Sequence, residues 1–199
     1  MQTGTTDTLS EWNLKEIGWE MIKVFALAIA IIIPIRVFLF QPFSVKGESM
    51  APSFQDGEYL IVYEHGYKKV QLGNFTFLEP SKEFHRGDAV VFHPPGSEKK
   101  YYIKRVIALP GESIAIIGGQ VVVYSEKEPE GRVLPEKYIN SGAELSDMSK
   151  LTLTTEEYFL MGDNRMFSFD SRNFGPITKD RLIGRVLIRA WPLPRAGIL

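Results

Sequence analysis

Hydrophobic residues are concentrated near the start of the chain, in one run between residues 19 and 40. From residue 24 to residue 33 every side chain is apolar, so a helix formed here lacks the polar face of a helix that packs onto a soluble core. At about 1.5 Å per residue the run would be ~33 Å long, which is enough to cross the hydrocarbon core of a bilayer. We therefore predict one transmembrane helix at residues 19–40.

Polar and aromatic residues at the ends of this run agree with a membrane span. Trp19 and Lys23 would lie at one interface, and Arg36 lies about one turn from the other end, where its long side chain reaches the head groups. A slight excess of lysine before the run predicts a cytoplasmic segment at residues 1–18. The alternatives are a cleaved secretory signal, disfavoured by the length of the run and the acidic residues before it, and a buried core helix.

Beyond residue 41 the pattern changes to short β-type runs separated by glycine and proline. Gly118 and Gly119 between two of these runs predict a tight hairpin. Because no amphipathic helices separate the runs, we predict an antiparallel, mostly β domain, a barrel or a sandwich, over residues 41–199. We expect the long polar segments 65–80 and 125–149 to be excursions from it. The predicted strands are 58–63, 88–92, 101–108, 114–117, 120–124, 158–161 and 182–191.

Composition narrows the classes of function. The 199 residues suffice for one such domain with its helix, and the formal net charge of -1 gives no field that would attract nucleic acid. The absence of cysteine excludes a thiol nucleophile, a thiolate metal site and any disulfide. The three histidines are scattered and form no zinc motif, so we expect neither a metal nor another cofactor.

A serine and a lysine in two separate motifs are candidates for a nucleophile and its base. Ser49 lies in a turn bounded by glycine and proline, where a serine alone is usually a turn residue. Lys104 lies in a predicted strand, on the same face as Tyr102 and Val106, while Arg105 points away. Removal from water lowers the pKa of a lysine, and a neutral amine can activate a serine hydroxyl. The alternative is an edge-strand lysine whose ammonium reaches water.

A third motif, residues 162–175, concentrates alternating charges and hydroxyls in one glycine-bounded loop. Ion pairs in a solvated turn contribute little to stability, but this density also suits an active-site wall that is ordered by paired charges and hydrogen bonds. The residues in question are Asp163, Arg165, Ser168, Asp170, Ser171 and Arg172.

Together the three motifs, in this order after an apolar segment, resemble the type I signal peptidases of bacteria and organelles. The matching patterns are S-M-x-P from residue 49, Y-x-K-R-V-x-x-x-P-G from residue 102, and G-D-N-R-x-x-S-x-D-S-R-x-x-G from residue 162. The resemblance implies a membrane-bound serine endopeptidase that removes signal peptides from secreted preproteins after small-x-small sites. It further implies a monomer in the plasma (inner) or thylakoid membrane, with its catalytic domain on the outer face and the protein export machinery as a further partner.

The resemblance also implies roles for individual residues. Ser49 would be the nucleophile and Lys104 the general base, acting through an acyl-enzyme. The implied supporting groups are Ser168, as a hydrogen-bond partner of the lysine, and the ion pairs of Asp163 with Arg105 and of Asp170 with Arg172. The implied substrate-binding residues are Phe43 and Tyr102, beside shallow pockets, and Met50 and Pro52, which would set the geometry of the nucleophile turn.

The chain departs from the family pattern at Gly47, where some members carry a serine hydroxyl that stabilises the oxyanion. The backbone N–H of Ser49 would then carry most of that role. Some members also have two spans, whereas this chain offers one. Three alternatives stay open: a serine-lysine protease of the self-cleaving repressor type, a serine-histidine enzyme for which His93 is the candidate base, and an inactive membrane-tethered β-domain that acts as a binding scaffold.

Overall fold

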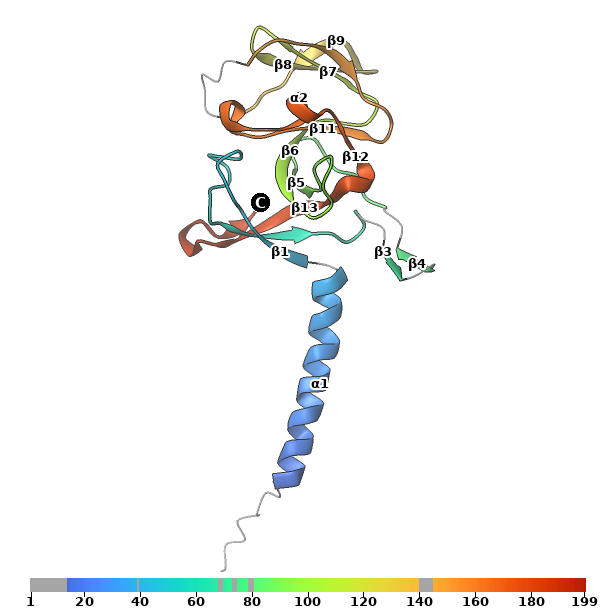
Figure 1. The fold of residues 1–199 in the computed structure, drawn as a ribbon, viewed down its shortest axis with the longest axis vertical. Coiled ribbons are helices and arrows are strands. Elements are labelled where there is room, and N and C mark those ends of the chain that lie inside the picture. The colour runs from blue at the N-terminus through green and yellow to red at the C-terminus, as the bar shows by residue number, and fades with distance from the viewer. Residues whose placement is uncertain (1–13, 39, 68–69, 73–74, 79–80, 140–144) are drawn as a thin grey trace, which may run out of the picture. The chain divides into compact units, whose positions relative to one another are not determined.

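The computed structural model describes residues 14–38, 40–67, 70–72, 75–78, 81–139 and 145–199. The chain divides into two compact units, Met1–Val37 and Phe38–Leu199. Among the described residues, the first unit contains one helix and the second contains the strands (Figure 1).

The helix of the first unit, α1, spans Leu14–Phe38. Within the part of the chain that the structure describes, no helix has both the length and the apolar character that a membrane crossing needs. The transmembrane helix expected at residues 19–40 is therefore not confirmed. Residues 19–38 are helical, residue 39 lies outside the described residues, and Phe40 begins the first strand.

The second unit is mostly β and antiparallel, as predicted from the strand pattern. Its largest sheet has eight strands, and the long strand β13 (Leu182–Trp191) lies inside it because it pairs with β2 on one side and with β5 on the other. Among the described strands the two ends of this sheet do not pair with each other, so the sheet is open. Its order is β1 (Phe40–Ser44), β2 (Tyr59–Tyr63), β13, β5 (Ala89–Phe92), β6 (Tyr102–Ala108), β11 (Glu157–Met161) and β12 (Ile177–Thr178), with β14 (Gly197–Ile198) paired to β13.

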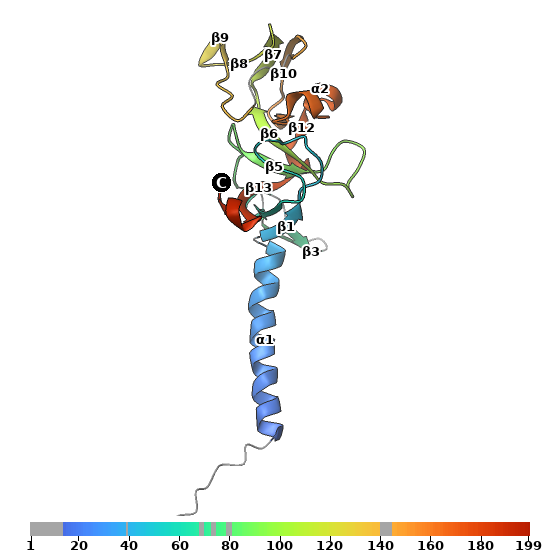
Figure 2. The same cartoon turned by 90° about the vertical axis from the view of Figure 1, so that its left-hand side faces the viewer.

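A second sheet of four strands lies at the other end of the domain from β1 (Figure 2). Gly118 and Gly119 join its central strands with φ angles of +56° and +76°, the conformation that a two-residue hairpin favours, and this confirms the predicted turn. Two of its strands begin within residues 125–149, so that segment builds a sheet and is not merely an excursion. The order is β10 (Met148–Thr152), β7 (Ser113–Ile117), β8 (Gln120–Ser125) and β9 (Glu128–Val133).

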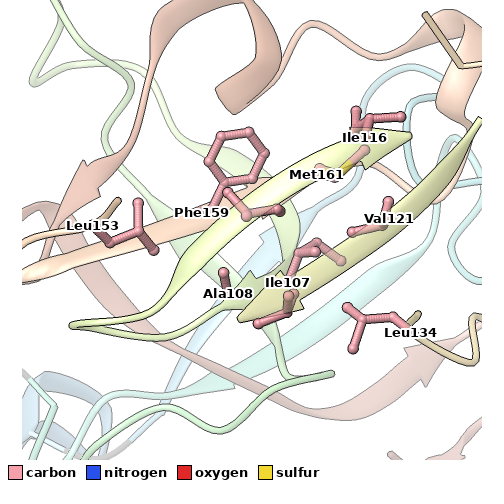
Figure 3. Close-up of a cluster of buried hydrophobic side chains, with 10 residues drawn as sticks. Ile107, Ala108, Ile116, Val121, Leu134, Leu153, Phe159 and Met161 are labelled. Carbon is pink, nitrogen blue, oxygen red and sulfur yellow. The ribbon is translucent and has the colours of Figure 1, made fainter. Parts of the chain in front are cut away.

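An apolar cluster joins the four-stranded sheet to β6 and β11 (Figure 3). Alternate residues of β7, β8 and β11 point into the cluster, whereas β6 contributes the consecutive residues Ile107 and Ala108, where its pairing with β11 shifts register. From the large sheet the cluster takes Ile107, Ala108, Phe159 and Met161, and from the small sheet and its flanks Ile114, Ile116, Val121, Val123, Leu134 and Leu153.

The remaining elements are short. The segment 65–80 contains a separate hairpin of β3 (Val70–Leu72) and β4 (Phe75–Leu78), and part of it lies outside the described residues. After β11 the chain forms a 3₁₀ turn at Arg165–Phe167 and the one-turn helix α2 (Ser171–Phe174). Asp170 caps α2, and its side chain accepts a hydrogen bond from the Arg172 N–H. Further 3₁₀ turns at Lys179–Arg181 and Leu193–Arg195 flank β13.

Candidate active site

The structure brings Ser49 and Lys104 together. The Nζ atom of Lys104 lies 2.6 Å from the Oγ atom of Ser49, within hydrogen-bonding distance, although 55 residues separate them in sequence. Lys104 is in the middle of β6 and is only 4% exposed. Burial lowers the pKa of Lys104 from 10.5 to about 8, while the carboxylates of Asp170 and Asp163 act in the opposite direction. At a pH slightly above 7, a substantial fraction of the Lys104 amine is therefore uncharged.

Ser49 lies in a turn that follows β1 and is fixed by its own backbone. Gly47 begins it with a φ of +85°, which favours glycine, and its N–H donates to the Asp56 carboxylate at 2.7 Å. The N–H of Ala51 donates to the carbonyl of Glu48 at 3.0 Å and so closes the turn around Ser49. Among the described residues the Ser49 N–H has no acceptor, so it is available to the carbonyl oxygen of a bound peptide.

Asn164 ties this turn to the loop after β11. Its backbone N–H donates to the carbonyl oxygen of Ser49 at 3.0 Å, and its side-chain amide donates to the carbonyl of Glu48 at 3.1 Å. Asn164 stands inside the third motif, but sequence reasoning did not assign it a role because both of its contacts are to backbone atoms 115 or more residues away.

Gly162, directly after β11, allows the loop of the third motif to lie close to the turn that carries Ser49. A Cβ atom added here would overlap the carbonyl oxygen of Ser49 and the side chain of Ser168. Only glycine leaves room for the two segments to pack at this distance.

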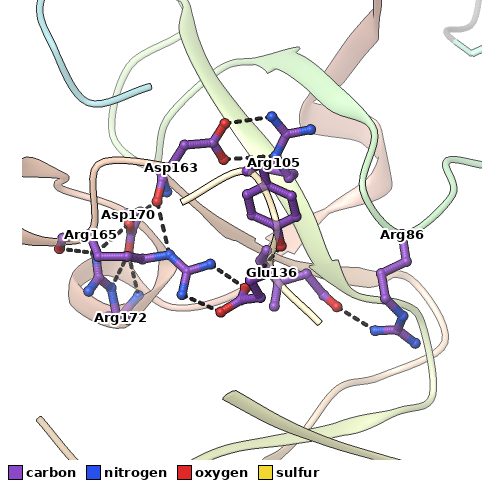
Figure 4. Close-up of polar contacts among 10 residues, drawn as sticks. Arg86, Arg105, Glu136, Asp163, Arg165, Asp170 and Arg172 are labelled. Atoms are coloured by element: carbon purple, nitrogen blue, oxygen red, sulfur yellow. Dashed lines mark hydrogen bonds and ion pairs between the residues drawn. The ribbon is translucent and has the colours of Figure 1, made fainter. Parts of the chain in front are cut away.

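Ion pairs hold the loop of residues 162–172 in place (Figure 4), and two of them were expected from the family resemblance. Arg105 donates from Nε and Nη2 to the two carboxylate oxygens of Asp163, at 2.7 and 2.5 Å, and from Nη1 to the carbonyl of Gly87 at 2.7 Å. Asp163 is 2% exposed, so this pair is largely removed from water. Because Arg105 is the neighbour of Lys104 on β6, the pair fixes the loop against the strand that carries the amine.

Asp170 and Arg172 form the second pair. Arg172 donates from Nε and Nη2 to the two oxygens of Asp170, each at 2.8 Å. Burial acts to raise the pKa of Asp170, but hydrogen bonds from Arg172 and from the N–H of Gly162 outweigh it, and the pKa is lowered. Asp170 therefore stays ionised, and its charge partly offsets the effect of burial on Lys104.

Ser168 does not make the contact that was expected of it. Its hydroxyl oxygen is buried and makes no hydrogen bond to Lys104 in this structure, but it is near enough to the Asp170 carboxylate to help lower the pKa of Asp170. The hydroxyl instead lies against the backbone of Gly162, while the Lys104 amine is engaged with Ser49.

A groove of about 720 Å³ passes over Ser49 and Lys104. Phe43 and Tyr102 line it, but Met50 and Pro52 do not: Met50 is 1% exposed in the core below the turn, and Pro52 is exposed outside the groove. These two residues can shape the turn, but the geometry gives them no contact with a ligand. Other lining residues are Val45, Leu60, Val91, Tyr101, Ile103, Phe167 and Phe169.

The family model and the curated relatives agree on one family. Residues 18–191 match the family model described as signal peptidase, peptidase S26. The chain is 32% identical to a signal peptidase I of Leptolyngbya laminosa, covering 90% of this chain and 83% of that protein, and 34% identical to a signal peptidase I of Bacillus licheniformis, covering 86% and 88%. A solved signal peptidase I from Enterococcus faecalis V583 is 26% identical, covers 53% of this chain and 97% of its own, and superimposes with a TM-score of 0.44.

Proposed function

The chain belongs to the signal peptidase family, peptidase S26, and on that premise we propose that Ser49 and Lys104 are the residues that carry out its reaction. The chain is a serine endopeptidase that removes signal peptides, and an inactive scaffold is not favoured. The observation that carries the assignment is the 2.6 Å contact between the buried amine of Lys104 and the hydroxyl of Ser49 at the floor of the groove.

The reaction is acyl transfer in two stages. Neutral Lys104 accepts the hydroxyl proton while Ser49 Oγ attacks the carbonyl carbon of the scissile peptide, and the Ser49 N–H donates to the developing oxyanion. The Lys104 ammonium then gives its proton to the leaving amine, which departs and leaves an ester on Ser49. In the second stage Lys104 deprotonates a water molecule that hydrolyses the ester and regenerates the free hydroxyl.

The groove fits an extended polypeptide with small side chains next to the cleaved bond. Phe43 and Tyr101 pack edge to face with centroids 5.1 Å apart, and Tyr102 continues the wall along β6. These rings reduce the depth available below the peptide, so residues with small side chains at the small-x-small positions bind best.

The first unit supplies a means of membrane association. Side chains of α1 that are more than half exposed include Trp19, Phe25 and Leu27, and contact with acyl chains would remove this apolar surface from water. We place the unit Phe38–Leu199 on the outer face of the plasma or thylakoid membrane, where exported preproteins emerge, and the segment before α1 in the cytoplasm.

Cleavage of a preprotein by the purified full chain in detergent tests this function. The products should be separated and weighed by mass spectrometry, which identifies the bond that was cut. We expect one cut, directly after a small-x-small sequence, and the same rate with and without a chelator because the Ser49–Lys104 mechanism uses no metal. An uncut preprotein, or cuts at unrelated positions, would exclude the assignment.

The pH dependence of kcat/KM follows from the lowered pKa of Lys104. Below pH 8 most of the amine is protonated and cannot accept the Ser49 proton, whereas above pH 8 most of it is neutral. We expect kcat/KM to rise tenfold per pH unit well below pH 8, with a midpoint near 8, and to level off above it. A profile that is flat between pH 6 and pH 9 would contradict the role of Lys104.

Phe167 and Phe169 form an exposed aromatic rim on the groove and should contribute to substrate binding. Replacing both with serine removes apolar contact area, and we expect KM to rise by about tenfold with kcat changed less than about twofold. Met166→Ser is the matched control, because Met166 is equally exposed but does not line the groove. Steady-state kinetics with a preprotein substrate distinguish the two cases.

A further inference from the structure

We infer that Glu136 and Tyr138, which follow β9 in sequence, are positioning residues for the catalytic pair. Both come from the segment 125–149, outside the three motifs. Glu136 pairs with Arg165 (Figure 4), and Tyr138 lies against Arg105. This inference rests on the proposed function. It adds the residues that keep the Lys104 amine within hydrogen-bonding distance of the Ser49 hydroxyl.

Glu136 forms a two-pronged ion pair with Arg165. Nη1 of Arg165 donates to Oε2 of Glu136 at 2.7 Å, and Nη2 donates to Oε1. The Arg165 side chain is 0% exposed and the Glu136 side chain 8% exposed. A buried guanidinium without a counter-charge is strongly unfavourable, so Glu136 is what allows Arg165 to stay inside the loop.

Arg165 in turn connects the parts of the loop that touch the site. Its Nε donates to the carbonyl of Gly162 at 3.1 Å, and its own carbonyl accepts from Nη2 of Arg172 at 2.9 Å. It directly follows Asn164, which holds the backbone of Ser49. The position of the nucleophile thus depends on Glu136 through Arg165 and Asn164.

Tyr138 extends the same support to the strand of the general base. Its hydroxyl donates to Oε1 of Glu136 at 2.9 Å, and its ring lies under the guanidinium of Arg105, with Cζ 4.3 Å from the ring centroid. Arg105 adjoins Lys104 and pairs with Asp163. Burial and the Glu136 carboxylate raise the pKa of Tyr138, so the hydroxyl remains a donor throughout the working range of pH.

A role in attaching the second sheet does not account for these contacts. The apolar cluster of Figure 3 already joins that sheet to β6 and β11. A buried ion pair adds little net stability compared with apolar side chains of similar volume. The Glu136 carboxylate is directed at Arg165, which follows Asn164, and the Tyr138 ring lies against Arg105, which follows Lys104. The Tyr138 hydroxyl links the two by donating to Glu136.

Glu136→Gln tests the inference, with kcat, KM and the pH profile measured on the folded full chain. Loss of the carboxylate leaves Arg165 uncompensated, so we expect kcat to fall about 30-fold with KM changed less than about twofold. Without the Glu136 carboxylate the charge of Arg165, which interacts with Asp163, is no longer balanced and disfavours the Lys104 ammonium, so the acidic limb of the profile should move to lower pH. Glu128→Gln is the matched control, because Glu128 forms an exposed ion pair with Arg132 on β9 and should leave both quantities unchanged.

Tyr138→Phe provides a second variant that keeps the ring under Arg105 and removes only the hydroxyl. We expect kcat to fall about fivefold with KM unchanged. If Glu136→Gln does not fold, this variant tests the positioning role by itself. Wild-type kcat and an unmoved pH profile in folded Glu136→Gln, or wild-type kcat in Tyr138→Phe, would overturn the inference. Failure of the wild-type chain to cut a preprotein would instead count against the proposed function.

Discussion

Replacing Lys104 with methionine should lower kcat by about three orders of magnitude while the protein stays folded. Methionine fills a similar volume but has no basic nitrogen, so the hydroxyl of Ser49 loses the group 2.6 Å away that accepts its proton. General-base catalysis is typically worth 10²–10⁴-fold, and no other lysine or histidine lines the groove at Ser49 in a buried position among the described residues. Single-turnover cleavage of a preprotein measures the loss.

Stability provides the control for this variant. The pKa of Lys104 is lower in the folded chain than its ordinary value of 10.5, so below pH 8 the fold holds a buried charge that the unfolded chain exposes to water. Lys104→Met should therefore raise the melting temperature at pH 7, and the difference should shrink as the pH rises toward 10.5. Lys99→Met, at an exposed lysine, should change neither activity nor stability.

Ser49→Ala should reduce activity as much as Lys104→Met, and the double variant should be no worse than either, because the two residues act as one unit. Additive losses in the double variant, or near-normal turnover in Lys104→Met, would contradict the assignment of Lys104 as the base of Ser49.

Gly162→Ala should reduce kcat by at least about 100-fold. The added methyl group would overlap the carbonyl oxygen of Ser49 and the side chain of Ser168, and neither can move without moving the nucleophile turn or the loop. A misplacement of ~1 Å is enough for a loss of this size, and overpacking should lower the free energy of unfolding by about 1–3 kcal/mol.

Gly197→Ala is the matched control for this substitution. Gly197 lies in β14 with no heavy atom near the position of an added Cβ and without a positive φ, so alanine should be tolerated there. Wild-type kcat in Gly162→Ala would mean that the close packing of Gly162 on Ser49 is not needed for the reaction.

The sequence predicted those strands that are short runs of β-branched, aromatic and other apolar residues. The runs that became β2, β5, β6, β7, β8, β11 and β13 are rich in valine, isoleucine and tyrosine, and all were found. β1 and β9 were missed, because Phe-Gln-Pro-Phe-Ser contains proline and begins inside the apolar run of residues 19–40, whereas Glu-Pro-Glu-Gly-Arg-Val contains proline and glycine and is mostly polar. Both are edge strands of their sheets, where such residues are tolerated, so burial gives them no signal in the sequence.

The site was predictable to the extent that its residues stand in contiguous motifs. Ser49 and Lys104, and the pairs of Arg105 with Asp163 and Arg172 with Asp170, were expected from the family resemblance that those motifs carry, and the structure brings each set together. The geometry of Ser168 was not predictable, because it depends on how the loop packs against Gly162.

The roles of Asn164 and Glu136 could not be predicted from the motifs. Asn164 acts on backbone carbonyls, and Glu136 reaches Arg165 from a segment whose polar composition indicates only a loop. Such contacts join segments that are distant in sequence, and no local pattern of residue types records them.

The proposed reaction depends most directly on the pKa of Lys104 in the folded protein. Nuclear magnetic resonance of the full chain with isotope-labelled lysine, with Lys104→Met to assign the signal, follows this amine alone as the pH is raised. We predict a titration midpoint near pH 8 for Lys104, well below the ordinary value of 10.5 for this side chain. A Lys104 midpoint near 10.5 would contradict a buried, neutral amine at Ser49.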